Sequence, residues 1–217
     1  MRESIDAHVR LLLAWTEAIN LTAVRDPVDA ARLHVLDSLT AVRLLRDRRV
    51  SRFVDLGSGG GFPGLPLALA LPAERALLVD SIGKKARFLE IATVALGAAP
   101  RVSVAAARAE SLARAAEHRE QWAAVAARAV GSLGELVELA FPLLAVGGLL
   151  VAWKRGGRGP ELDAAGRALA ALGGGRIEVL DAGLPELIGH RLVVVDKAGP
   201  TDPRFPREPA DRRRRPW

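Results

Sequence analysis

The first 50 residues carry apolar positions at helical spacing. Between residues 3 and 19, one apolar stripe with charged residues elsewhere predicts an amphipathic helix, and its members are Ile5, Val9, Leu12, Leu13 and Thr16. After a loop at residues 20–22, Asp26 and Pro27 are typical of an N-cap and a first helical position, and they predict a second helix to about Leu39. We therefore expect residues 1–50 to form a helical prefix.

From Arg52 the pattern changes to short apolar runs that alternate with helical segments. This alternation is typical of a parallel sheet covered by helices on both faces. The predicted strands are 52–56, 76–80, 101–105, 122–127, 147–153, 176–180 and 191–197. The predicted helices lie near 63–71, 84–97, 109–118, 132–144 and 160–172, and the glycine-rich segments at 156–159 and 173–175 predict loops.

The last two predicted strands are separated by about ten residues, from Asp181 to His190. This connection is too short for the crossover that a parallel pair requires, so the two strands should form an antiparallel hairpin. A doubly wound, mostly parallel seven-stranded sheet that finishes with one reversed strand is typical of the Rossmann-like fold of class I methyltransferases. Nicotinamide dehydrogenases do not finish their sheet in this way. The expected fold class is therefore α/β of the class I methyltransferase type.

The chain has 217 residues, half of them apolar, which is enough for one well-filled core. We expect this core in a domain over residues 51–198. From Gly199 onward the chain has five prolines and six arginines with little apolar material, so residues 199–217 are expected to form a poorly packed basic tail.

Charge and cysteine content restrict the function. The net charge of +6 favours a polyanionic partner, although the excess of arginine over lysine is also what a GC-rich genome produces. The chain has no cysteine, which excludes disulfides, thiolate metal sites and a cysteine nucleophile. The first residues lack the apolar run of a signal peptide and no segment is a membrane span, so a cytoplasmic protein is expected. No histidine or carboxylate cluster suggests a metal site, so none is predicted.

The strongest local motif is the sequence FVDLGSGGGFPG over residues 53–64. A strand ends close to Asp55, and a glycine-dense turn over residues 57–63, here called the glycine loop, runs into a helix. Glycine allows close approach of a ligand and positive φ, and the helix N-terminus offers free N–H groups. The spacing also fits a dinucleotide fingerprint. Asp55 favours a methyl donor over a nicotinamide cofactor, because an anion before the loop repels pyrophosphate and accepts hydrogen bonds from the ammonium group of a methionine moiety.

Asp80 ends the second strand about 25 residues after Asp55. In both cofactor classes an acid at this place holds the ribose hydroxyls through strong, charge-assisted hydrogen bonds. The alternative is that Asp80 caps the helix that starts near Gly83.

Two groups of cations lie near the expected ligand-binding edge. Lys84, Lys85 and Arg87 fall in the first turns of a helix, where the helix dipole disfavours them unless phosphate is near; a merely solvated face is the alternative. Arg128 and Lys154 end the fourth and fifth strands, where ligands bind in such sheets. They are the candidate catalytic residues, unless they pair with Asp55 or Glu135.

An ordered series of motifs resembles one family over nearly the whole chain, the ribosomal RNA small-subunit methyltransferase G family, also called glucose-inhibited division protein B. The matching segments are residues 20–23, 25–27, 34–39 (HVLDSL), 55–66 (DLGSGGGFPGLP), 80–85 (DSIGKK), 108–110, 128–129, 153–156 and 200–207 (PTDPRFPR).

The resemblance implies methylation of N7 of a guanine in bacterial 16S ribosomal RNA near the decoding centre, with S-adenosylmethionine as the donor. The 16S RNA or the small subunit would be the partner of a monomeric enzyme. The donor pocket that the resemblance implies uses Gly57, Phe62, Asp80, Ala109, Glu110 and Arg128, with the main chain at Ala109 and Glu110 meeting the adenine. The expected cofactor-binding set adds Asp55, Gly59 and Ser81 to these. The expected RNA-binding residues, chosen for their charge and position, are Lys84, Lys85, Arg204 and Arg207. A nicotinamide-dependent oxidoreductase and a non-catalytic RNA-binding assembly factor with the same fold are the competing interpretations.

Overall fold

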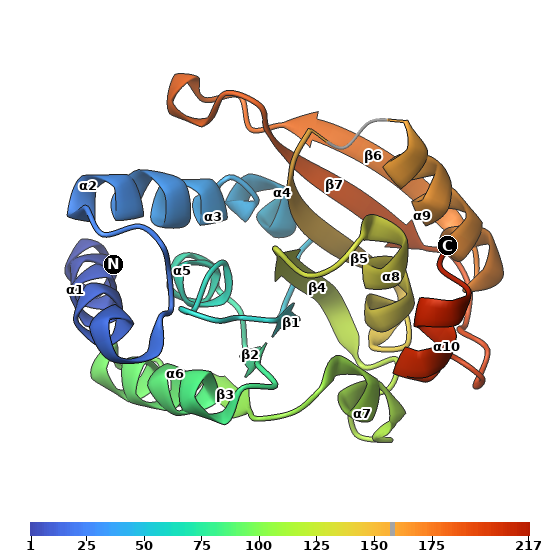
Figure 1. Cartoon of the computed structure of the whole chain (residues 1–217), viewed down its shortest axis with the longest axis horizontal. Coiled ribbons are helices and arrows are strands. Elements are labelled where there is room, and N and C mark those ends of the chain that lie inside the picture. The colour runs from blue at the N-terminus through green and yellow to red at the C-terminus, as the bar shows by residue number, and fades with distance from the viewer. Residues whose placement is uncertain (157–158) are drawn as a thin grey trace. The chain divides into compact units, whose positions relative to one another are not determined.

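The computed structural model describes residues 1–156 and 159–217. Residues 157–158, part of the loop predicted at 156–159, lie outside the described residues. The chain divides into two compact units, one of residues 1–107 with 182–188 and one of residues 108–181 with 189–217. Figure 1 labels helices and strands along the chain. The division into a prefix, a domain and a tail stays a prediction.

The first unit contains three parallel strands. They are β1 (Arg52–Leu56), β2 (Arg75–Val79) and β3 (Val102–Ala105), in the order β3-β2-β1. In β1 and β2 every residue after the first is buried. A run of buried residues without alternation is what a parallel strand covered on both faces requires, so these strands could be predicted from their apolar runs.

The helices of the first unit include the two that were predicted within residues 1–50. They are α1 (Arg2–Ile19), α2 (Pro27–Ala30), the π-helical segment η1 (Ala31–Leu36), α3 (Asp37–Leu39), α4 (Val42–Asp47), α5 (Gly64–Ala70), α6 (Gly83–Ala95) and the 3-10 turn η2 (Pro185–Leu187). The Asp26 side chain accepts hydrogen bonds from the main-chain N–H of Val28 and Asp29, both at 2.9 Å, as expected for the N-cap of α2. Helix α1 packs against α2 and α6. The π-helical segment and α4 were not predicted.

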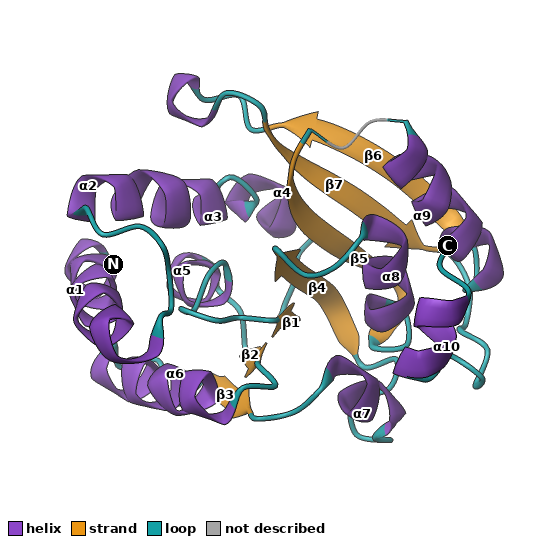
Figure 2. Cartoon of the chain, viewed as in Figure 1, coloured by secondary structure: helices purple, strands orange, loops and turns teal. Residues whose placement is uncertain are grey.

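The described part of the second unit contains four strands. Figure 2 draws the strands of the chain in orange. They are β4 (Trp122–Arg128), β5 (Leu144–Arg155), β6 (Gly175–Asp181) and β7 (His190–Lys197), in the order β4-β5-β7-β6. Strand β7 is antiparallel to both β5 and β6, which confirms the predicted hairpin. The helices are α7 (Ala109–Arg114), α8 (Leu133–Ala140), α9 (Pro160–Ala171) and α10 (Pro209–Arg214), and α8 packs against α7 and α9.

The strands of the described residues form a mostly parallel, seven-stranded sheet that ends in an antiparallel hairpin, with the order β3-β2-β1-β4-β5-β7-β6. The predicted fold class is therefore confirmed. No helix in residues 1–156 and 159–217 combines the length and the apolar character that crossing a bilayer requires.

The expectation of a poorly packed tail was wrong. Thr201, Phe205 and Arg212 are buried, and residues 209–214 form helix α10. The Arg119 side chain donates hydrogen bonds to the main-chain oxygens of Thr201, at 3.1 Å, and Phe205, at 3.0 Å. The segment is ordered because its polar main chain and its arginines find partners on the second unit, which the low apolar content of the tail does not reveal.

Candidate functional site

The glycine loop connects β1 to α5 and is anchored on β2. The main-chain N–H groups of Gly57 and Ser58 donate to the Val79 carbonyl oxygen, at 2.8 and 3.0 Å. The φ angles of Gly57, Gly59 and Gly61 are 71°, 54° and 87°, a region that residues with a Cβ enter only with strain. The loop therefore needs glycine at these positions to turn at the carboxyl ends of β1 and β2, the edge where ligands bind in sheets of this kind.

Asp55 lies beneath this loop. It is fully buried, and its Oδ2 accepts a hydrogen bond from the Gly64 N–H at 2.9 Å, where α5 begins. A carboxylate is stabilised at a helix N-terminus, so this contact ties the end of the loop to β1. The structure thus gives Asp55 a loop-positioning role, and its contact with a methionine ammonium group stays a prediction.

Asp80 follows β2 and reaches the loop directly. Its Oδ2 accepts the Gly59 N–H and its Oδ1 accepts the Ile82 N–H, both at 2.9 Å. Ile82 is the N-cap residue of α6 and makes no side-chain cap, so Asp80 supports the turn before the helix and does not occupy the cap position itself. A carboxylate offers about four acceptor sites, so each oxygen keeps capacity for a hydroxyl of a ligand. Asp80 is 7% exposed, which leaves its carboxylate at the margin of the core beside the loop.

The other predicted residues of the first unit differ in exposure. Phe62 is buried, so a contact of this residue with a ligand would use its main chain. Ser81 and Lys84 are exposed, and Lys85 is half-buried in the first turn of α6. The RNA-binding roles of Lys84 and Lys85 stay predictions.

His8 of α1 contacts the glycine loop and was not predicted. Its Nε2 lies 2.8 Å from the Gly60 carbonyl oxygen, and its ring stacks on Phe62. One sequence signal was available, because His8 lies three residues after Ile5 and four before Leu12, inside the apolar stripe of the helix.

In the second unit, Ala109 and Glu110 open helix α7, and the Glu110 side chain is taken by an arginine of α10. The Arg212 guanidinium pairs with the Glu110 carboxylate and also with Glu135, at 3.3 Å. Burial alone would raise the pKa of Glu110, but the hydrogen bonds that its carboxylate accepts and the positive charges of Arg212 and Arg108 together outweigh burial, so the pKa lies below its usual value. The pairing involves the Glu110 side chain only, and the contact of the Ala109 and Glu110 main chain with adenine stays a prediction.

The structure gives the partners of one of the two strand-end cations, Lys154. Arg128 is the last residue of β4. The Lys154 Nζ donates to Glu161 Oε1 at 2.6 Å and to the Gly131 carbonyl oxygen at 3.2 Å, so the partner is Glu161 rather than Asp55 or Glu135. Lys154 is therefore a fixed, charged group, and its catalytic assignment stays a prediction.

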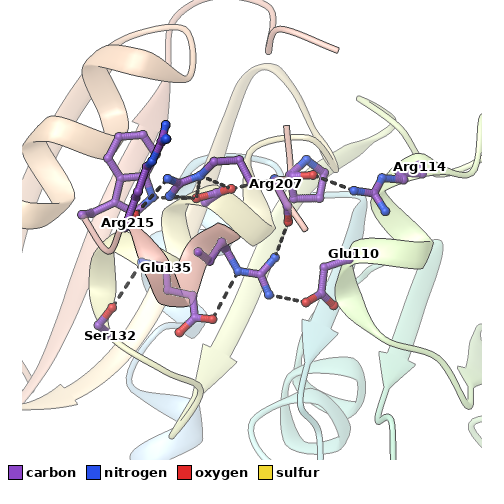
Figure 3. Close-up of polar contacts among 10 residues, drawn as sticks. Glu110, Arg114, Ser132, Glu135, Arg207 and Arg215 are labelled. Atoms are coloured by element: carbon purple, nitrogen blue, oxygen red, sulfur yellow. Dashed lines mark hydrogen bonds and ion pairs between the residues drawn. The ribbon is translucent and has the colours of Figure 1, made fainter. Parts of the chain in front are cut away.

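The two predicted RNA-binding arginines of the tail also differ. Arg204 is exposed and lies over the Phe205 ring, 5.1 Å from its centroid. Arg207 donates through Nε and one terminal nitrogen to both oxygens of the buried Glu138, at 2.6–3.1 Å, within the network drawn in Figure 3. The Trp217 indole N–H donates to the same carboxylate at 2.7 Å. These contacts give Arg207 a structural role in the second unit, and phosphate binding by either arginine stays a prediction.

A glycine loop after the first strand, an acid after the second, and a sheet that ends in one reversed strand define a class I S-adenosylmethionine-dependent methyltransferase. An O-methyltransferase from Bacillus cereus in complex with SAH is similar in fold, with a TM-score of 0.63 and 16% identity over 88% of this chain and 91% of that one. An O-methyltransferase from Streptomyces achromogenes in complex with SAM has a TM-score of 0.62, with 16% identity over 88% of this chain and 90% of that one. These likenesses show the fold.

Closer relatives give the family. The family described as rRNA small subunit methyltransferase G matches residues 1–183. Proteins named ribosomal RNA small subunit methyltransferase G are 41% identical in Roseiflexus castenholzii (90% of this chain, 83% of the relative) and 43% identical in Deinococcus radiodurans (91% and 78%). The relative of that name in Halalkalibacterium halodurans is 37% identical over 99% of this chain and 90% of its own length. The chain belongs to the rRNA small subunit methyltransferase G family.

Proposed function

We propose that this chain transfers the methyl group of S-adenosylmethionine to N7 of a guanine in bacterial 16S ribosomal RNA. The observation that carries the proposal is the contact of Asp80 with the glycine loop. This contact brings a carboxylate acceptor and positive-φ glycines together at the carboxyl ends of the strands. The chain belongs to the rRNA small subunit methyltransferase G family, in which such a site would bind S-adenosylmethionine. The donor set fits the ligand, because hydroxyls require acceptors and Asp80 retains them.

Bound S-adenosylmethionine supplies an activated methyl group on its sulfonium centre. Asp80 would accept hydrogen bonds from the ribose hydroxyls, and the main chain at Gly57 and Gly59 would line the methionine end. In the second unit, the main chain at Ala109 and Glu110 would meet the adenine. None of these contacts removes a proton, so the contribution of the residues is alignment of the methyl group.

Guanine N7 needs no general base. It carries an in-plane lone pair and no proton, so it attacks the methyl carbon directly as the bond to sulfur breaks, and the purine gains a positive charge. The reaction requires alignment and an environment that tolerates this charge. Arg128 and Lys154 would hold the ligand or the RNA. The ion pair with Glu161 fixes the position of the Lys154 ammonium group.

Calorimetry with S-adenosylmethionine and with NAD tests the donor. We expect wild-type protein to bind S-adenosylmethionine and not NAD. Asp80→Ala should weaken the binding on the order of 10- to 100-fold, because charge-assisted hydrogen bonds are worth roughly 1.5–3 kcal/mol each. Asp47→Ala, at the exposed end of α4, is the control and should leave the affinity unchanged. Unchanged affinity of Asp80→Ala would contradict the ribose assignment.

Methyl transfer to naked 16S RNA, to an assembly intermediate and to the mature small subunit tests the acceptor. The product should be cleaved by aniline after borohydride reduction, as a cationic N7-methylpurine is. Single-turnover rates with saturating RNA should show no deprotonation step between about pH 6 and 9. A product that resists cleavage, or a rate that rises tenfold per pH unit, would point to an exocyclic amine or a ribose hydroxyl. Binding of RNA without transfer to any of the three would favour the assembly factor.

A further inference from the structure

His8 is a buried polar residue that connects helix α1 to the glycine loop. It is 0% exposed, and its Nε2 lies 2.8 Å from the carbonyl oxygen of Gly60. The two residues are 52 positions apart in the sequence. The contact therefore joins the helical prefix to the loop that follows β1.

The protonation state of His8 defines the direction of this hydrogen bond. Burial lowers the pKa of His8 to about 4, although the hydrogen bond to Gly60 opposes this, so the ring is neutral at pH 7. A carbonyl oxygen only accepts, so the single N–H of the neutral ring must be on Nε2. Within the described residues, Nδ1 has no hydrogen-bond partner. All of the hydrogen bonding of the side chain is thus directed at the loop.

The same side chain also contacts Phe62, the aromatic residue of the glycine loop. The rings of His8 and Phe62 are stacked, with centroids 4.4 Å apart and an angle of 16° between their planes. His34 of η1 also packs on the Phe62 ring, with the ring centroids 5.1 Å apart. The Nε2 of His34 is hydrogen-bonded to Thr22 Oγ1 at 2.7 Å. Phe62 is therefore held by two histidines that both come from the prefix.

Steric contacts show that the loop has one side against the prefix and one side without such contacts. A Cβ at Gly60 would lie 2.5 Å from Leu12 of α1, and a Cβ at Gly61 would lie 2.9 Å from the His8 ring. By contrast, a Cβ at Gly59 would meet only a main-chain oxygen, at 3.8 Å. Gly57 is exposed and Gly59 is half-buried. The middle of the loop is thus pressed on α1, while its first part stays accessible to a ligand.

We propose that His8 is a positioning residue for S-adenosylmethionine binding, and that the helical prefix is part of the donor site through it. His8 holds the Gly60 carbonyl and the Phe62 ring, so that the main chain at Gly57 and Gly59 keeps the conformation that Asp80 and the donor require. The inference rests on the proposed function, in which the glycine loop binds the donor. It adds a residue and a segment that touch the loop and not the ligand.

The test compares His8→Phe, His8→Gln and His8→Asn by calorimetry with S-adenosylmethionine. Phenylalanine keeps an aromatic ring but lacks the N–H group that donates to Gly60. The amide nitrogen of glutamine reaches the position of Nε2, whereas that of asparagine stops at the position of Nδ1. We expect His8→Phe and His8→Asn to weaken donor binding roughly 5- to 50-fold, because the Gly60 oxygen loses its partner. His8→Gln should restore the affinity to within about threefold of wild type.

Two controls separate positioning from loss of stability. Val9→Ala removes a buried side chain from the same helix and should lower the melting temperature while leaving the donor affinity unchanged. In steady-state methylation, His8→Phe should raise the KM for S-adenosylmethionine and leave the KM for RNA unchanged. The comparison of His8→Gln with His8→Asn decides the question even where His8→Phe does not fold.

Wild-type affinity in His8→Asn, or an equal loss in His8→Gln and His8→Asn, would overturn the inference. A loss in Val9→Ala as large as in His8→Phe would overturn it as well, since it would reduce His8 to general packing. Wild-type protein that does not bind S-adenosylmethionine would overturn the proposed function, and the inference with it.

Discussion

Arg207→Met tests whether the C-terminal segment holds the second unit together. The substitution keeps most of the length of the side chain and removes the guanidinium from Glu138, a residue that is 0% exposed. It leaves two other donors to the carboxylate, the main-chain N–H of residue 207 and the Trp217 indole, both at 2.7 Å. A buried carboxylate would thus remain with hydrogen bonds but without its counter-charge.

Removing one partner of a buried ion pair costs about 3–5 kcal/mol. The two remaining donors place Arg207→Met towards the lower end of this range. At about 3 kcal/mol the melting temperature should fall by about 6–12 °C, because 1 kcal/mol corresponds to roughly 2–4 °C for a chain of this size. Adding Glu138→Gln should recover about 1–2 kcal/mol, because it removes the uncompensated charge and keeps an acceptor.

Urea unfolding followed by circular dichroism measures these changes, with Arg204→Met as the matched control. Arg204 is exposed and its contact with Asp202 is 3.5 Å long, so its loss should cost at most about 1 kcal/mol. If Arg207→Met costs no more than Arg204→Met, the pair does not hold the tail and the reasoning is refuted.

Three further predictions follow from named contacts. Burial raises the pKa of Glu138, but hydrogen bonds from Arg207 and Trp217 hold the pKa below its usual value. The ionised carboxylate therefore stabilises the folded state fully above about pH 4.3, and this stabilisation is lost as the pH falls further. Glu138→Gln should flatten this acid limb in urea midpoints, and an unchanged limb would contradict the pairing. Gly64→Ala should lower the free energy of unfolding by about 1–3 kcal/mol, because its Cβ would lie 2.3 Å from Leu78. Gly166→Ala in α9 places its Cβ in open space and should raise the free energy of unfolding by about 0.5–1 kcal/mol. Thermal unfolding measures both, and shifts of the same sign would contradict the packing at Gly64. Arg212→Ala should cost about 2–4 kcal/mol by urea unfolding and the exposed Arg213→Ala at most about 0.5 kcal/mol, and equal costs would show that the Glu110 pair contributes nothing.

The features that could be predicted from the sequence depend on neighbours in the chain. The buried runs of β1 and β2, the Asp26 cap and the short connection before β7 are all local patterns, and the structure confirms them. The glycine loop was predictable for the same reason, since the positive φ angles fall on three alternate glycines of one motif, Gly57, Gly59 and Gly61.

The features that were missed depend on partners far away in the sequence. Helix α10 has the sequence PADRRR, with no apolar stripe, and Arg212 reaches Glu110 across 102 positions. The contact of His8 with Gly60 is likewise set by the packing of α1 on the loop. Charge and polarity at these positions showed that partners were needed but not which ones.

The pairing of Glu138 with Arg207 also has a consequence for synthesis on the ribosome. Arg207 follows Glu138 by 69 residues, which at about 5–20 residues per second is a delay of roughly 3–14 s. Before Arg207 is available, packing against the Glu138 face of α8 would bury a carboxylate without its counter-charge. We therefore expect this face of the nascent second unit to stay hydrated until Arg207 is available to pair with Glu138.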